Sequence, residues 1–303
     1  MPPPRSAADP AVAPTVDFVI AGAQKAASST LFELLRQHPA LAMPEAKEVQ
    51  FFSREDYYRQ GASYLAVYRR GVAVGKPFGL ADVQIMYFPE APARLVETNP
   101  AMRAFVVLRN PIDRAYSAYW YGRWRDLEPA ATFEAALERE GERATGSYHD
   151  QAGLTYLRHG HYAEQLKRLR AALGDRVMVL RYEELVADPA ACARRAFAWL
   201  GVDAGATIDT DIHANPTGRP RVRWLQRLIV ASSLRRLAGR VVPLGVKYWV
   251  RRRLLLPLLE GNRKAERYPP MEAATRRRLV EYYRARNAEL AAMLGVDLSS
   301  WDR

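Results

Sequence analysis

The sequence predicts an α/β fold of three layers, α/β/α, with a central parallel sheet between the helices and a helical cap at the C-terminal end. Short apolar runs typical of buried strands alternate with amphipathic runs typical of helices. This alternation indicates a parallel sheet covered on both faces. The chain has 303 residues, of which 49% are hydrophobic, so it can bury a core of that size.

Three strand-to-helix units build the predicted sheet. Each starts as an apolar run, breaks at Gly, Pro or a polar turn, and continues with apolar residues at helical spacing. The units are Asp17–Gly22 with Ser28–Gln37, Arg103–Leu108 with about Asp113–Tyr121, and Val177–Leu180, followed by a turn around Tyr182, with about Pro189–Leu200.

The remaining segments fit one domain. Residues 1–16 contain five prolines and little periodic apolar content, which predicts a flexible N-terminal segment. No linker separates two cores after it, so residues 17–303 are expected to form a single domain. Its basic helical cap covers about 219–303 and includes a final helix over about Met271–Leu294.

Composition excludes several classes of protein. No apolar run reaches the roughly 18 residues that span a bilayer, and the N-terminal residues lack a compact apolar stretch with a cleavage site. We therefore expect a cytoplasmic protein. Cys192 is the single cysteine and cannot form an internal disulfide, and no Cys/His cluster has the spacing of a zinc site. We expect no metal.

The net charge of +12 is concentrated in one segment. Residues 219–278 contain 17 Lys and Arg against 3 Glu, a net +14, so the rest of the chain carries −2. No nucleic-acid-binding motif accompanies this charge, and we expect no nucleic-acid partner. Within it, Leu225–Leu259 interleaves apolar residues with Arg, which favours either helices packed on the domain with a solvated Arg face or peripheral contact with a membrane or a carrier-bound substrate.

The turn after the first strand is suited to binding an anion. It runs from Gly22 to Thr30 and ends in the first turn of a helix, where backbone N–H groups and the helix dipole favour negative charge. Lys25 adds a cation, and hydroxyl side chains follow it. The spacing is not that of a Walker A motif, so a nucleotide-dependent kinase has little support. A serine N-cap beside a solvated lysine is the structural alternative.

A second anion site is predicted at the end of the next strand. Arg109 follows the apolar run 105–108 directly, at the carboxyl edge where doubly wound folds bind ligands. Ser117 lies further along the next helix. An arginine fork and a hydroxyl suit a second phosphate, although Arg109 could instead cap the helix or pair with Asp113. Two such sites indicate a nucleotide whose phosphates are at separate positions.

These segments resemble the nucleotide-binding motifs of sulfotransferases that use 3′-phosphoadenosine 5′-phosphosulfate (PAPS). DFVIAGAQKAASSTLFELL and FVVLRNPIDRAYSAY carry the resemblance, and KEVQFF at Lys47–Phe52 is similar to a segment of the heparan-sulfate and related Golgi-type branch. It extends over most of the chain after Asp17, through 180–189 and 215–221 to Trp301. The family's fold is a P-loop-like α/β/α sandwich.

The resemblance implies how the nucleotide binds. The first turn would hold the 5′-phosphosulfate, with Lys25 stabilising the bridging oxygen as the sulfuryl group leaves, and Arg109 and Ser117 would bind the 3′-phosphate. Tyr182 would pack near the adenine, and the late loop with Arg219 and Arg221 would fold over the nucleotide. The residues of the first turn that this assigns to the phosphosulfate are Lys25, Ala26, Ala27, Ser28, Ser29 and Thr30.

The resemblance also implies the acceptor side of the reaction. Glu48 matches the family's general base, and its apolar neighbours could desolvate it and raise its pKa. An exposed pair with Lys47 is the structural alternative for Glu48. Lys47 and Asp82 would face the acceptor, a hydroxyl or, as the second choice, an amine of a glycan or natural product. His149, His159 and His161 are back-up bases.

Four departures from the family pattern limit how many of the family's residue roles can be assigned to this sequence. Ala27 stands in place of a glycine in the first turn, and Gln50 in place of a histidine that could titrate. Asp82 replaces a glutamate, and Val83 replaces the adjoining lysine, which argues against a heavily anionic glycan as acceptor. Two alternatives remain open, a phosphoryl transferase on a related scaffold and a non-catalytic protein that binds anions or membranes.

Overall fold

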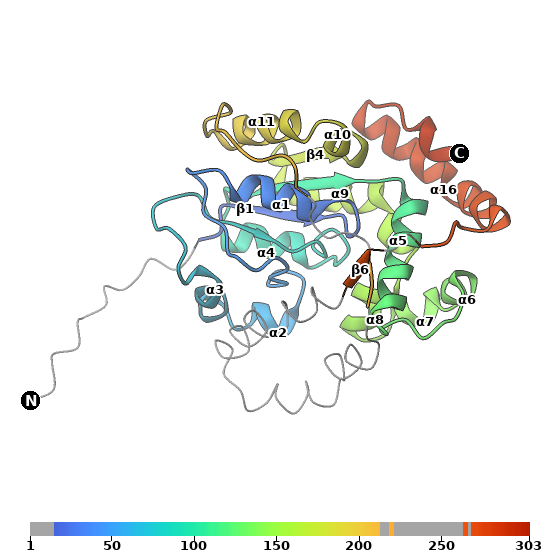
Figure 1. Cartoon of the computed structure of the whole chain (residues 1–303). Helices are drawn as coiled ribbons and strands as arrows, with labels where there is room; N and C mark the ends of the chain where they lie inside the picture. The colour runs from blue at the N-terminus through green and yellow to red at the C-terminus, as the bar shows by residue number, and fades with distance from the viewer. Residues whose placement is uncertain (1–14, 213–217, 221–262, 266–267) are drawn as a thin grey trace, which may run out of the picture.

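A computed structural model describes residues 15–212, 218–220, 263–265 and 268–303. Its centre is a four-stranded parallel sheet with the strand order β2-β1-β3-β4 (Figure 1). The strands are β1 (Phe18–Gly22), β2 (Gly79–Ala81), β3 (Arg103–Leu108) and β4 (Val177–Arg181). Every residue of β1 is buried, as the continuous apolar run predicts.

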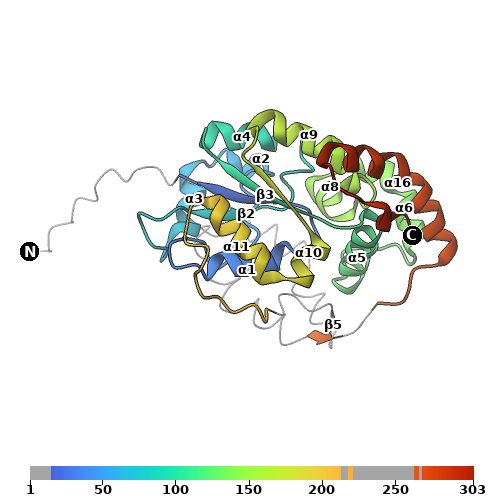
Figure 2. The same ribbon diagram turned by 90° about the horizontal axis from the view of Figure 1, so that it is seen from above.

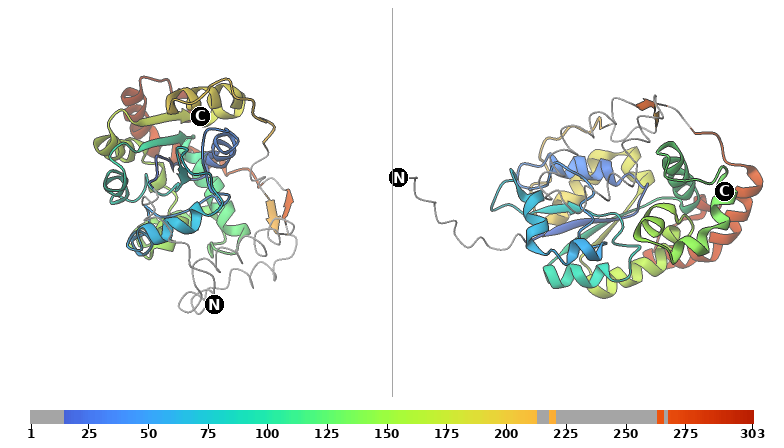
Figure 3. Two further views of the ribbon diagram at one scale, coloured as in Figure 1. Left: turned by 90° about the vertical axis from the view of Figure 1, so that its left-hand side faces the viewer. Right: turned by 90° about the horizontal axis from the view of Figure 1, so that it is seen from below.

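Helices cover both faces of this sheet, which confirms the predicted fold class. On one face α1 (Ser28–Arg36) packs against α11 (Pro189–Leu200), and on the other α4 (Ala91–Thr98) packs against α9 (Tyr162–Leu173). Figure 2 shows the strands between these two pairs, and Figure 3 shows the same layers from two further sides. Each helix buries its apolar stripe on the sheet and leaves its charged side to water.

Shorter helices fill the connections. Between β1 and β2 lie α2 (Glu55–Tyr58) and α3 (Ala62–Arg69), and α10 (Tyr182–Ala187) follows β4. Residues between β3 and α9 form α5 (Pro111–Trp124), α6 (Phe133–Glu138), α7 (Glu140–Ala144), α8 (Tyr148–Leu154) and the 3₁₀ helix η1 (Arg158–Gly160).

The C-terminal part packs on the side of the sheet where β3 leads into α5. There α16 (Ala273–Leu294) contacts α5 and α9, and the 3₁₀ helix η3 (Ser299–Asp302) packs on α16. The described residues before it form an antiparallel ribbon of β5 (Gly218–Pro220) and β6 (Arg263–Ala265), which the sequence pattern did not predict. Residues 221–262, which hold 10 of the 17 Lys and Arg counted over residues 219–278, lie outside the described residues.

Three boundaries differ from those predicted. Val16, expected in the flexible segment, is fully buried, and its carbonyl accepts a hydrogen bond from Asn99. The turn expected around Tyr182 is the start of α10. The helix expected to begin near Asp113 begins at Pro111, because Asn110 accepts the N–H of Ile112 as an N-cap and proline suits the first helical position. None of the described helices is long and apolar enough to cross a bilayer.

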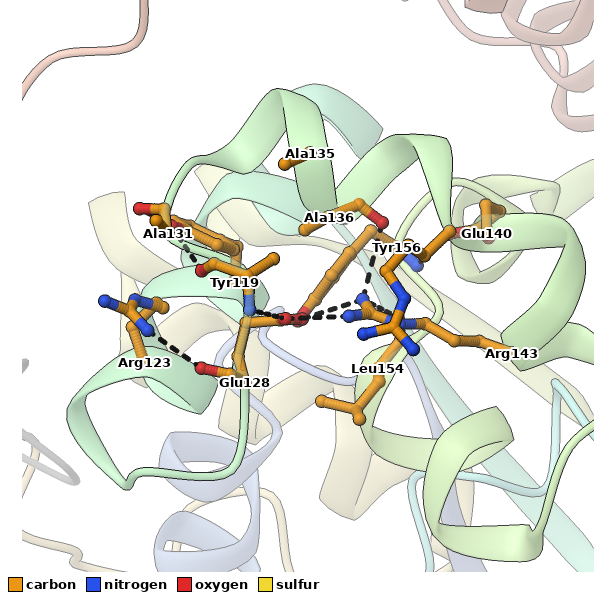
Figure 4. Close-up of polar contacts among 12 residues, drawn as sticks. Tyr119, Arg123, Glu128, Ala131, Ala135, Ala136, Glu140, Arg143, Leu154 and Tyr156 are labelled. Carbon is orange, nitrogen blue, oxygen red and sulfur yellow. Dashed lines mark hydrogen bonds and ion pairs between the residues drawn. The ribbon is translucent and has the colours of Figure 1, made fainter.

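A buried ion pair organises the connection between α5 and α9. The Glu128 carboxylate accepts two hydrogen bonds of 2.7 Å from the Arg143 guanidinium and one of 2.6 Å from the Tyr156 hydroxyl (Figure 4). The Glu128 side chain is 0% exposed and that of Arg143 is 3% exposed. Burial among aromatic rings raises the pKa of Tyr156, so its hydroxyl stays a donor. These buried contacts therefore connect the segment after α5, which holds Glu128, to α7 and to the segment after α8.

Candidate functional site

The sheet topology brings the two predicted anion sites together. β1 and β3 are parallel neighbours in the centre of the sheet, with Phe18 opposite Arg103 and Ile20 opposite Phe105. Their carboxyl ends therefore lie at one edge, and the turns that follow them are adjacent. The N–H of Ala23 donates to the carbonyl of Val107 at 2.9 Å and ties the start of the first turn to β3.

The first turn has a backbone suited to holding a phosphate. Ala27 is the N-cap residue of α1 and lies in the left-handed region at φ 64°, and Lys25 lies there too at φ 65°. Left-handed backbone costs an L-residue roughly 1 kcal/mol or more, and such strain gathers at ligand-binding sites. Ala27 stands where the family has a glycine, and it nevertheless adopts the left-handed backbone that glycine adopts most easily. Ser28, Ser29 and Thr30 form the first turn of α1.

Arg109 joins the two turns directly. Its Nη1 donates to the backbone carbonyl of Lys25 at 3.0 Å, and its own carbonyl accepts the Tyr162 hydroxyl at 3.0 Å. Its guanidinium lies over the ring of Tyr182, 4.5 Å from the centroid. The alternative pairing with Asp113 is not seen, because the Asp113 carboxylate pairs with Arg276. Lys25, Arg109 and Tyr182 thus form one chain of contacts across the ends of β1, β3 and β4.

The other residues assigned to this end are placed less directly. Ser117 is buried in α5, about two turns after its start. Arg219 belongs to β5, where its backbone pairs with Lys264. Arg221 lies outside the described residues. The role of Ser117 at the 3′-phosphate and those of Arg219 and Arg221 in a loop over the nucleotide remain predictions.

Lys25 makes an aromatic contact that the sequence pattern did not predict. The Lys25 ammonium lies 4.3 Å from the ring centroid of Tyr121, and the Arg125 guanidinium lies 4.2 Å from the same centroid. Tyr121 is 39% exposed and stands at the C-terminal end of α5. Because Lys25 and Tyr121 are 96 positions apart in sequence, no local pattern could have paired them.

Glu48 and Lys47 lie against the first turn. The Lys47 ammonium forms an ion pair with the Glu48 carboxylate and donates to the Ser28 hydroxyl at 3.2 Å. The Glu48 side chain is 29% exposed, so the apolar residues that follow it do not enclose it as the sequence suggested. Val49, Phe51 and Phe52 are buried in the core instead. The Glu48 carboxylate is therefore connected to the predicted phosphate-binding turn through the Lys47 side chain.

Asp82 lies beneath this acidic group rather than on the surface. It is 0% exposed, and its carboxylate accepts hydrogen bonds from the Ser53 N–H at 2.9 Å and the Ser53 hydroxyl at 2.8 Å. Next to it, the Val49 N–H donates to the Ala81 carbonyl at 2.9 Å. These bonds fasten the segment that carries Glu48 to the end of β2. Asp82 is thus enclosed in this structure, and its expected role in binding the substrate remains a prediction.

The Asp82 carboxyl should make stability depend on pH. Burial raises its pKa to about 6, and the charge of Glu48 adds to the rise, against the hydrogen bonds from Ser53. In the unfolded chain it ionises near pH ~4, so the folded state holds the extra proton between pH ~4 and about 6 and this carboxyl's contribution to stability falls as pH rises through that window.

Asp82→Asn cannot titrate and isolates this effect. The free energy of unfolding of the wild type minus that of the variant should decrease by on the order of 3 kcal/mol as pH rises from ~4 to ~6, and then level off. Urea unfolding at half-unit pH steps measures it. A difference that is constant across this range would mean that Asp82 ionises in the folded protein as it does in the unfolded chain.

The three histidines differ in their access to the site. His159 is buried, with Thr155 and Gln84 2.9 and 3.0 Å from its two ring nitrogens, and burial lowers its pKa well below the usual value. Burial also lowers the pKa of His161 to about 4, and its ring nitrogen lies 2.9 Å from the Tyr282 hydroxyl. Both are engaged in internal contacts. His149 is exposed on α8, and the role of any of the three as a back-up base remains a prediction.

Comparison with known proteins agrees with this geometry. The family described as "Sulfotransferase domain" matches residues 15–215. The chain is 26% identical over 302 residues to bifunctional heparan sulfate N-deacetylase/N-sulfotransferase 4 of Mus musculus, and 27% identical over 304 residues to the corresponding protein 3 of Homo sapiens. Each match covers 94% of this chain, which spans 31% of the length of these relatives.

A solved structure matches over nearly the whole fold. The sulfotransferase from Alicyclobacillus acidocaldarius is 25% identical, with a TM-score of 0.68. The match covers 95% of this chain and 99% of that one. The strands and helices that position Lys25 and Arg109 are therefore part of an architecture that the two proteins share.

Proposed function

Since the chain belongs to the sulfotransferase domain family and is therefore an enzyme of sulfuryl transfer, we propose that its donor is PAPS and its acceptor a hydroxyl or, as the second choice, an amine of a glycan or natural product. The observation that carries the proposal is the hydrogen bond from Arg109 to the Lys25 carbonyl, because it joins two cationic turns at one sheet edge. A nucleotide with a 5′-phosphosulfate and a 3′-phosphate offers an anion to each.

The two turns fit the two ends of this nucleotide. The N-terminus of α1, with Lys25 and the hydroxyls of Ser28 to Thr30, provides the donors for the 5′-phosphosulfate. Arg109 provides a fork for the 3′-phosphate, and the Tyr182 ring beside it offers an apolar face to the adenine. Bound PAPS supplies a sulfur atom that is already joined to a good leaving group, the 5′-phosphate.

The chemical step needs a base and a cation, and the site holds both. The acceptor oxygen or nitrogen forms a bond to sulfur while the bond from sulfur to the bridging phosphate oxygen breaks, which releases 3′,5′-ADP. Glu48 takes the proton that the acceptor loses. Lys25 offsets the negative charge that develops on the departing phosphate, as cations do in phosphoryl transfer.

Lys47 connects these two roles. It contacts both the Glu48 carboxylate and the Ser28 hydroxyl. A cation in this place holds the Glu48 carboxylate beside the first turn. Binding of the donor at the first turn can therefore change the position of Glu48 through Lys47.

The acceptor is best sought among weakly charged molecules. Val83 is buried and apolar where the resemblance would have a lysine, and Lys47 is already neutralised by Glu48. The relatives' names, heparan sulfate N-deacetylase/N-sulfotransferase, support the inclusion of an amine of a glycan among the candidates. Hydroxyls and amines therefore belong in the same screen.

A screen with sulfur-labelled PAPS tests the reaction and the acceptor together. The panel contains neutral oligosaccharides, glucosamine oligomers with free amines, sulfated glycans and phenolic natural products. We expect label in a neutral or amine-bearing acceptor and an equal amount of released 3′,5′-ADP. Thermal stabilisation by ATP without stabilisation by 3′,5′-ADP, and no transfer to any member, would replace this proposal with a phosphoryl transferase.

A further inference from the structure

The C-terminal Trp301 touches both elements that would hold the 3′ half of the nucleotide. It lies in η3 and is 2% exposed. Its indole N–H donates to the Glu183 carboxylate at 3.2 Å. Its backbone carbonyl accepts the Asn110 side-chain amide at 3.1 Å. Glu183 directly follows Tyr182, and Asn110 directly follows Arg109.

Asn110 carries this contact to Arg109. Its side-chain oxygen accepts the N–H of Ile112 and caps α5, while its side-chain nitrogen donates to Trp301. Both ends of one amide are therefore used, and the turn after β3 is fixed between the start of α5 and the C-terminus. Asn110 is 7% exposed, so water cannot readily replace either bond.

A second route runs through Tyr162. Its ring packs against the Trp301 indole, with centroids 6.3 Å apart, and its hydroxyl donates to the Arg109 carbonyl at 3.0 Å. Tyr162 is 1% exposed, and burial raises its pKa to about 12. Its hydroxyl is therefore protonated and able to donate at neutral pH.

The far side of η3 is fastened to α16. Asn287 donates to the Asp302 carboxylate at 2.9 Å, and Arg276 donates to the carbonyl of Arg303 at 2.9 Å. The C-terminal segment is thus held on two sides, by α16 through Asp302 and Arg303 and by the two turns through Trp301. A rigid support of this kind keeps binding groups in position before the ligand arrives.

We propose that Trp301 is a positioning residue that sets Arg109 and Tyr182 for the 3′-phosphate and adenine. This rests on the proposed function and adds to it that the C-terminus determines discrimination for the 3′-phosphate. The Trp301 side chain itself does not touch the nucleotide. It acts through Asn110, Glu183 and Tyr162.

Binding of two nucleotides to graded variants tests this. Dissociation constants for 3′,5′-ADP and 5′-AMP are measured by calorimetry on the full chain, together with melting temperature. Trp301→Phe keeps the ring and loses the N–H, so its preference for 3′,5′-ADP should fall about three-fold, the size of one hydrogen bond. Trp301→Ala should lower the preference about ten-fold or more; 5′-AMP, which has the adenine but no 3′-phosphate, should also lose affinity, but less than 3′,5′-ADP does.

Trp199 supplies the matched control. Its ring packs on Phe105 of β3, 4.9 Å between centroids, so Trp199→Phe and Trp199→Ala damage the core without touching the two turns. They should lower the melting temperature and leave the nucleotide preference unchanged. The inference is overturned if folded Trp301→Ala keeps the wild-type preference or, should that variant not fold, if Trp301→Phe keeps it. A wild type that does not prefer 3′,5′-ADP at all overturns the proposed function as well.

Discussion

Replacing Glu48 with glutamine is expected to lower the rate of sulfuryl transfer by about two orders of magnitude and to leave the affinity for 3′,5′-ADP within about two-fold. Glutamine keeps the size of the side chain but cannot take the acceptor's proton. The affinity should be kept because Lys47, and not Glu48, contacts the first turn at Ser28. Single-turnover transfer from labelled PAPS gives the rate, and calorimetry gives the affinity.

Glu33→Gln is the control for this substitution. Glu33 is in α1, and pairs with Arg36 on the surface, so the same change of charge there should leave transfer unaffected. Full activity in Glu48→Gln would remove Glu48 as the base. His149 would then be the residue to test, since His159 and His161 have internal partners.

The second large effect concerns stability and lies away from the site. Arg143→Met is expected to lower the free energy of unfolding by about 3–5 kcal/mol, because it leaves the fully buried Glu128 carboxylate without its counter-charge. Tyr156 and the Ala130 N–H would still donate to Glu128, but neither carries a charge. Urea unfolding followed by far-UV circular dichroism measures the change.

Two further variants test whether the loss of stability in Arg143→Met comes from the burial of its ion pair. Arg139→Met breaks an ion pair with Glu142 whose side chains are 45% and 67% exposed, and it should cost less than about 1 kcal/mol. The double variant Glu128→Gln with Arg143→Met should recover part of the loss, since no buried charge remains. A loss under about 1 kcal/mol for Arg143→Met alone would show that Glu128 reaches water or another cation.

Much of the fold follows from local patterns. The run Phe18–Gly22 is apolar throughout and Arg103–Leu108 is apolar after its first residue, so they predict buried parallel strands that the structure contains. β2 has three residues and the ribbon of β5 and β6 has three in each strand. Runs this short carry no period that distinguishes them from a loop, and their pairing depends on tertiary contacts.

Site residues at the ends of strands could be predicted from the sequence, whereas those that depend on contacts between distant segments could not. Lys25 and Arg109 follow apolar strands, and adjacency of those strands brings them together. Asp82 is polar and near a strand end, but only its partner Ser53, 29 positions away, shows that it is internal. Tyr121 and Trp301 are aromatic residues whose roles arise from contacts across the chain.

The central claim is that Lys25 and Arg109 hold opposite ends of one nucleotide. Calorimetric titration of 3′,5′-ADP and 5′-AMP into the wild type, Arg109→Gln and Lys25→Met tests it most directly. The wild type should prefer 3′,5′-ADP by about 10- to 100-fold, the value of a charge-assisted hydrogen bond. Arg109→Gln should lose this preference, whereas Lys25→Met should weaken both nucleotides alike. Equal affinity of the wild type for the two nucleotides, or an unchanged preference in Arg109→Gln, would contradict the account.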